Sequence, residues 1–160
     1  MADKEMIQEK IGEALGLEKA AQKAVDELHS RGLLQPEHMK KLTSMKEQAA
    51  EQEEEMEVLV QELTDSDGFD SSSIEEKAVE TAQKVSKIME TYLGKEPDTQ
   101  EALEFLCLME GVEVMNYKVL NTTAKVLNNK RFQSRLKSIL REIRSHLDCT
   151  KLAKRNALSE

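Results

Sequence analysis

The chain has 160 residues, and its 31 acidic and 23 basic side chains give a formal net charge of −8 at pH 7. This length suits one domain with a sizeable core, so we expect residues 1–160 to fold as a single domain. Nucleic-acid binding requires a positive surface, so the charge argues against a nucleic-acid partner. No apolar run approaches the roughly 20 residues of a membrane span, and the opening MADKEMIQEK lacks a signal-peptide core. We therefore expect a cytoplasmic protein without a membrane partner.

The first predicted elements are two long helices, from about Asp3 to Ser30 and from about Pro36 to Leu63. In each, the apolar residues recur in alternating steps of four and three, which is typical of helices packed nearly parallel to their neighbours. Gly32 suits the end of the first helix and Pro36 the first turn of the second. The short connection places the two helices side by side as an antiparallel hairpin.

A long crossing follows, from Thr64 to Asp98. Its first part, TDSDGFDSSS at residues 64–73, is polar and is predicted to be a loop. A shorter helix is then expected over residues 73–94, with Ser72 or Ser73 as its cap.

A second hairpin completes the chain. Asp98 and Glu101 form a start signal for a helix that runs to about Leu127, and Asn128 with Asn129 provides a turn before a last helix to about Ala157. The sequence thus predicts an all-α fold. We expect a four-helix bundle of two antiparallel hairpins, with a long crossover that contains a fifth helix.

Carboxylates interrupt the apolar seams near the middle of the predicted bundle. When each hairpin is folded about its turn, Glu18 lies level with Ala49 to Gln52 or Glu53, and Glu113 lies level with Ile143 to His146. A buried carboxylate must be paired, protonated or bound to a cation, and a divalent metal relieves the repulsion between several of them. The candidate metal ligands are Glu18, Glu53, Glu113, Glu142 and His146. The alternative is that these side chains lie at the helix flanks and reach water.

At this point the chain resembles a known family. Two hairpins, a helical crossover and glutamates in the middle of helices resemble the ferritin-like superfamily, and most closely the branch of small bacterial stress proteins that includes YciF. The stretch EGVEVMNYKVL resembles the fourth helix of that branch, with Glu113 and Tyr117 in comparable places and Val114 where a histidine would stand. LREIRSHLDCTKLA resembles its last helix, but His146 follows Glu142 by four positions, whereas the di-iron signature Glu-x-x-His has a spacing of three.

The resemblance implies a stress-associated bundle that binds iron or manganese at a mid-bundle carboxylate site. The alternative from a different functional class is a metal-free structural or protein-interaction bundle, and the sequence leaves open whether the protein is an enzyme. We also expect a homo-oligomer, a dimer, because residues 47–70 contain acids but no Lys or Arg, whereas Lys and Arg dominate residues 130–155. Cys107 and Cys149 are predicted to be free thiols.

Overall fold

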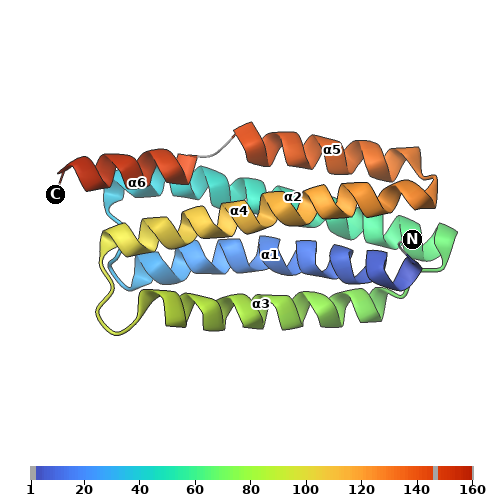
Figure 1. The fold of residues 1–160 in the computed structure, drawn as a ribbon, viewed down its shortest axis with the longest axis horizontal. Coiled ribbons are helices and arrows are strands. Elements are labelled where there is room, and N and C mark those ends of the chain that lie inside the picture. The colour runs from blue at the N-terminus through green and yellow to red at the C-terminus, as the bar shows by residue number, and fades with distance from the viewer. Residues whose placement is uncertain (1–2, 146–147, 160) are drawn as a thin grey trace.

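The computed structural model describes residues 3–145 and 148–159, and these residues form helices joined by short connections (Figure 1). Within these ranges there is no strand, so the predicted all-α class is confirmed. The elements in chain order are α1 (Lys4–Ser30), α2 (Pro36–Asp67), α3 (Ser71–Leu93), α4 (Thr99–Thr123), a 3-10 turn (Ala124–Leu127), α5 (Lys130–Ser145) and α6 (Asp148–Ser159).

Helix α1 occupies the centre of the arrangement, where it packs against α2, α3 and α4. The chain reverses direction at each connection, so α2 and α4 run in one direction while α1, α3 and the α5–α6 segment run in the other (Figure 1). The predicted hairpin of the first two helices is confirmed by the packing of α1 on α2. The more specific ferritin-like resemblance stays a prediction.

The prediction of a loop over residues 64–73 is wrong, because α2 continues to Asp67 and only residues 68–70 separate it from α3. The hydroxyls of Thr64 and Ser66 donate hydrogen bonds to carbonyls one turn earlier in the helix, which accommodates these polar residues within it. Gly68 then ends α2 in the left-handed conformation, with φ of 63°. The cap of α3 is Asp70, whose carboxylate accepts from the next backbone amides, and not Ser72 or Ser73.

The predicted start signals of α4 and α2 are confirmed. Asp98 caps α4 and accepts from the amide of Glu101, while the Glu101 side chain accepts from the amide of Asp98. Pro36 lies in the first turn of α2. The predicted last helix corresponds to α5 and α6, on either side of residues 146–147, which lie outside the described residues.

Helix α3 lies directly against α1 because two glycines remove the side chains that would separate the backbones. A Cβ atom on Gly16 would lie 2.5 Å from the carbonyl oxygen of Ala78, and one on Gly12 would lie 2.6 Å from Cβ of Lys77. Helices α1 and α3 run parallel (Figure 1), so successive contacts follow the same order along both helices. Residues 71–93 are thus a full-length neighbour of α1.

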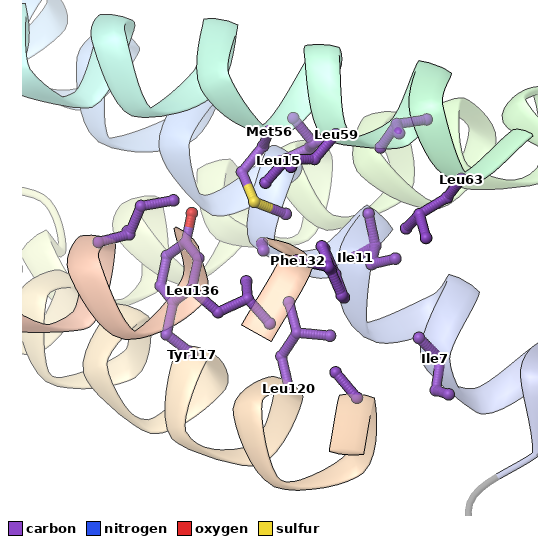
Figure 2. Close-up of a cluster of buried hydrophobic side chains, with 14 of the residues drawn as sticks. Ile7, Ile11, Leu15, Met56, Leu59, Leu63, Tyr117, Leu120, Phe132 and Leu136 are labelled. Carbon is purple, nitrogen blue, oxygen red and sulfur yellow. The ribbon is translucent and has the colours of Figure 1, made fainter. Parts of the chain in front are cut away.

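The core is divided into two hydrophobic clusters by a layer of buried polar side chains. The first cluster includes Ile7, Ile11 and Leu15 of α1 (Figure 2), and the second begins at Leu17 and extends to Leu28 on the same helix. The buried polar residues between them are Glu18, Gln52, Glu110, Glu113 and Asn116. None of the helices described here is both long and apolar enough to cross a membrane.

The contact between α1 and α3 generates the first prediction. Gly16→Ala should lower the free energy of unfolding by about 2 kcal/mol, because the new methyl group meets backbone that cannot move aside cheaply. Gly111→Ala is the matched control, because nothing lies within 4 Å of its Cβ position. At a protein concentration low enough to keep the chain monomeric, this control should stabilise α4 by up to about 1 kcal/mol through helix propensity alone. Urea denaturation of both variants measures the difference, and equal effects would contradict the packing described.

Candidate functional site: a buried carboxylate cluster

Glu18 of α1 is the most deeply buried acidic side chain, with 0% of its surface exposed. Its Oε1 atom accepts a hydrogen bond of 3.0 Å from the hydroxyl of Tyr117, and its Oε2 atom has no hydrogen-bond partner among the described residues. Burial raises the pKa of Glu18 from 4.5 to about 8, the bond from Tyr117 lowers it, and the charge of Glu53 raises it further. Glu18 is therefore a neutral acid at neutral pH in the unliganded protein.

Helix α4 contributes two more buried carboxylates, Glu110 and Glu113, each 7% exposed. They lie three residues apart and hence on neighbouring positions of one helix face. Burial raises the pKa of Glu113 well above its ordinary value, and the charges of Glu18 and Glu110 raise it further. Glu18, Glu110 and Glu113 thus form one electrostatically linked group, which we call the carboxylate cluster.

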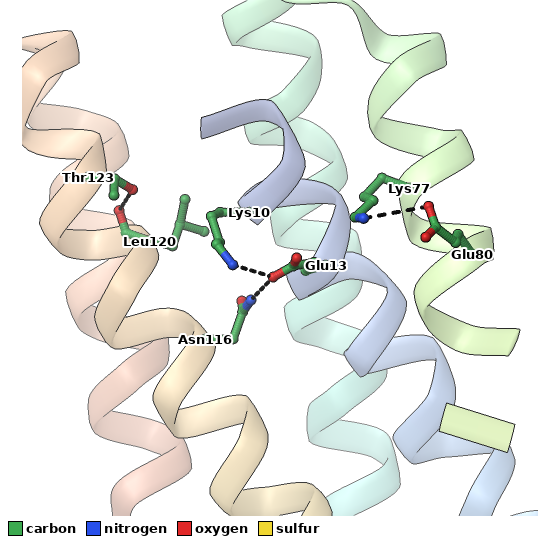
Figure 3. A network of polar contacts seen from close by, with 7 residues as sticks. All are labelled: Lys10, Glu13, Lys77, Glu80, Asn116, Leu120 and Thr123. Atoms are coloured by element: carbon green, nitrogen blue, oxygen red, sulfur yellow. Dashed lines mark hydrogen bonds and ion pairs between the residues drawn. The ribbon is translucent and has the colours of Figure 1, made fainter. Parts of the chain in front are cut away.

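A second polar contact joins the same two helices beside the cluster. The carboxylate of Glu13 accepts from Lys10 at 2.9 Å and from the amide of Asn116 at 3.0 Å (Figure 3). The side chain of Glu13 is 27% exposed, so its charge is partly solvated and also paired. Glu13, at the edge of the bundle, is therefore paired with a cation and partly solvated, in contrast to Glu18.

Two of the predicted metal ligands, Glu53 and Glu142, form hydrogen bonds with glutamine side chains. Glu53 accepts a hydrogen bond of 2.6 Å from Gln22 and lies 3.9 Å from Nζ of Lys19. Glu142 is exposed, and its Oε2 atom lies 3.3 Å from the amide nitrogen of Gln52, which donates to it. His146, the remaining predicted ligand, lies outside the described residues.

The cluster borders a small cleft of about 50 Å³ that is partly open to solvent. Glu110 and Glu113 stand on its wall together with Gln52, and the side chain of Lys46 lies at the same cleft but pairs with Asp26 at 2.7 Å. Apart from Gln48, the rest of the lining is apolar or a thiol and comes from α1, α2, α4 and the α5–α6 segment: Ala21, Val25, Met45, Ala49, Leu106, Met109, Ile143 and Cys149. The cleft therefore combines an apolar wall with two carboxyl groups.

The thiols are both free, as predicted, with Cys149 buried and Cys107 half-buried. Burial raises the pKa of Cys149, and the charge of Glu110 together with a hydrogen bond to it raises this pKa further. The Sγ atom of Cys149 lies 3.6 Å from the sulfur of Met45. Neither observation indicates an activated thiolate, because activation requires a lowered pKa.

The donor set does not assemble into a metal centre in residues 3–145 and 148–159. No group of three or more His, Cys, Asp or Glu side chains in this part of the chain is arranged to hold a metal ion. Carboxylates are suitable ligands for divalent cations, but a site needs several of them directed at one point. The buried Oε2 atom of Glu18 lacks a hydrogen-bond partner among the described residues, whereas Glu53 and Glu142 accept hydrogen bonds from Gln22 and Gln52.

Sequence reasoning placed Glu18 and Glu113 in the interior, and both are buried there. It omitted Glu110 from the candidate ligands. The signal that could have included it is its spacing of three from Glu113 within the same apolar run.

Comparison of the chain with known protein families, with curated proteins and with solved structures finds no match.

The raised pKa of Glu18 generates the second prediction. In the unfolded chain Glu18 ionises near its ordinary pKa of 4.5, whereas in the folded protein it holds its proton to about pH 8. Unfolding between these pH values therefore releases a proton, so stability is greatest at low pH and falls as the pH rises through this window. Glu18→Gln should reduce the loss of unfolding free energy between pH 5.5 and pH 8 by an amount on the order of 3 kcal/mol.

The control for this prediction is Glu9→Gln, which alters an exposed acid of the same helix and should leave the pH dependence unchanged. Urea denaturation of the three proteins at several pH values provides the measurement. Parallel curves for the wild type and Glu18→Gln would contradict the buried, neutral state of Glu18.

Proposed function

We propose that this protein is a helical bundle that binds a small organic cation in its interior cleft. The observation that carries the proposal is the pairing of two buried carboxyl groups, Glu110 and Glu113, with an otherwise largely apolar lining. A ligand with an apolar body and a protonated amine matches both features. The amine would neutralise the cluster, and the body would contact the apolar wall.

The electrostatics favour a cation over other small ligands. Burial raises the pKa of Glu18 and of Glu113, and the charges of Glu18 and Glu110 raise that of Glu113 further, so an anion such as a fatty acid would add to the repulsion. A cation has the opposite effect, because it stabilises the ionised carboxylates and lowers their pKa. Binding therefore releases protons, and the affinity should rise as the pH increases from 6 toward 8.

A divalent metal is the second candidate ligand. It is the function implied by the resemblance to the ferritin-like superfamily, in which a cytoplasmic, stress-associated bundle holds iron or manganese among mid-bundle carboxylates. The observation that favours it is the buried Oε2 atom of Glu18, which lacks a hydrogen-bond partner in the described residues and lies in the same electrostatic group as Glu110 and Glu113. In such a site these carboxylates would hold the metal and balance its charge.

The third prediction separates the candidates. The melting temperature and the heat of binding are measured at pH 7.5 with n-octylammonium, with octanoate, and with Mn(II) or anaerobic Fe(II). The proposal expects n-octylammonium to bind and raise the melting temperature, because it carries both the charge and the apolar body, and octanoate to have no effect. Stabilisation by a metal but not by the amine would establish the second candidate. If none of the probes changes the melting temperature or gives a heat of binding, the remaining candidate is the metal-free structural or protein-interaction bundle.

Two variants locate the binding. Glu113→Gln keeps the shape of the side chain but cannot carry the negative charge, so it should weaken n-octylammonium binding at least tenfold while stabilising the unliganded protein at pH 8. Glu54→Gln, an exposed acid on α2, should change neither property. Equal losses in the two variants would indicate non-specific attraction to the acidic surface and would contradict binding in the cleft.

A further inference from the structure

Helix α4 presents an apolar surface to solvent on the side opposite the core. Leu108, Met115 and Val119 are 43%, 56% and 38% exposed, and Val112 lies half-buried between them. Their steps of four, three and four are those of a helix–helix seam, which this helix otherwise shows only on its buried side. In the view of Figure 1 no helix lies in front of α4. We call Leu108, Gly111, Val112, Met115 and Val119 the outer face of α4.

Gly111 lies between Leu108 and Met115 along α4, beside this seam, and is not explained by packing within the described residues. A Cβ atom there would meet nothing within 4 Å, whereas Gly12 and Gly16 each allow a neighbouring backbone to approach. Glycine weakens the interior of a helix relative to alanine, and no packing within the described residues offsets that cost at Gly111. A second helix crossing at Gly111 would supply such packing, because the missing side chain permits close approach.

Two residues of opposite charge, Glu104 and Lys118, flank Gly111 along α4. Glu104 precedes Gly111 by seven residues and Lys118 follows it by seven, so all three lie along one side of α4. Both charged side chains are exposed, and within the described residues Lys118 forms no ion pair. A helix approaching in the antiparallel direction with a crossing at Gly111 would need a basic residue opposite Glu104 and an acidic one opposite Lys118.

We propose that the partner is a second copy of this chain, with the two α4 helices packed antiparallel across a two-fold axis at Gly111. The two-fold axis places Glu104 of each copy opposite Lys118 of the other, and it places Leu108 of each copy beside Met115 of the other. A parallel pair would set like charges opposite each other, so the charge pattern selects the antiparallel arrangement. The inference is independent of the proposed ligand, because the outer face and the cleft lie on opposite sides of α4.

The first test is the oligomeric state of the full chain measured by sedimentation velocity from 1 to 200 μM. We expect a concentration-dependent dimer. Met115→Glu places a charge in the centre of the interface and should weaken the association at least tenfold. The matched control is Val79→Glu, at a valine of α3 that is 47% exposed, which should leave the association unchanged. A monomeric wild type, or a dimer that Val79→Glu disrupts and Met115→Glu does not, would overturn the proposal.

Charge exchange tests the pairing across the axis. Glu104→Lys and Lys118→Glu should each weaken the dimer, because each places like charges opposite one another twice per dimer. The double variant Glu104→Lys/Lys118→Glu restores opposite charges and should recover association close to that of the wild type. Circular dichroism confirms that each variant is folded before its association is compared. A double variant as weak as the single ones would overturn the arrangement.

Cross-linking tests the direction of the helices in a Cys107→Ser background, which removes the half-buried native thiol. Gly111→Cys places two thiols at the axis and should give a disulfide-linked dimer on mild oxidation. Val119→Cys places them about 24 Å apart in the antiparallel pair, from the helical rise of eight residues on each side, and should not cross-link. Efficient cross-linking at both positions would indicate a parallel pair and overturn the proposal, as would cross-linking at neither.

Discussion

The central position of α1 is the constraint on which the rest of the structure depends. Because α2, α3 and α4 all pack against it, the middle of this helix is buried on nearly every side, including the run from Ala14 to Glu18. In a bundle where α1 had one free side, Glu18 would turn toward water. Here Glu18 contacts Tyr117 of α4, while α3 lies close against α1 at Gly12 and Gly16. The burial of a carboxylate follows from the helix packing and not from any special feature of the residue itself.

That buried carboxylate then governs the interior of the bundle. Its only hydrogen-bond partner among the described residues is Tyr117, and its nearest charges are other acids, so protonation is the state that the folded chain favours in the absence of a ligand. The same helix that carries Tyr117 carries Glu113 and Glu110, which extend the polar group to the wall of the cleft. A cation entering the cleft would favour the ionised form of Glu113, whose pKa is raised in its absence. This coupling links the cleft to α1 although Glu18 is not part of the cleft lining.

The sequence predicted the helical class and most helix ends, because Gly32, Pro36 and the Asp98–Glu101 pair are local signals whose effect does not depend on tertiary structure. It failed at residues 64–67, where polar side chains bond back to their own helix and therefore do not break it. The interior position of Glu18 and Glu113 could be predicted from their place in apolar seams. The hydrogen bonds of Glu53 and Glu142 could not be predicted, because they depend on side-chain amides of Gln22 and Gln52 that a helical pattern does not orient.

The polar layer also separates two hydrophobic clusters along the length of the bundle, with Leu15 on one side and Leu17 on the other. Apolar burial is what makes the unfolding of a small domain cooperative, and here that burial is discontinuous at the height of Glu18. The two ends of the bundle are thus coupled mainly through the helices that span both and through contacts around the carboxylate cluster. Amide exchange in one half can therefore report openings that do not require the other half to unfold, and the charge state of the interior sets how independent the two halves are.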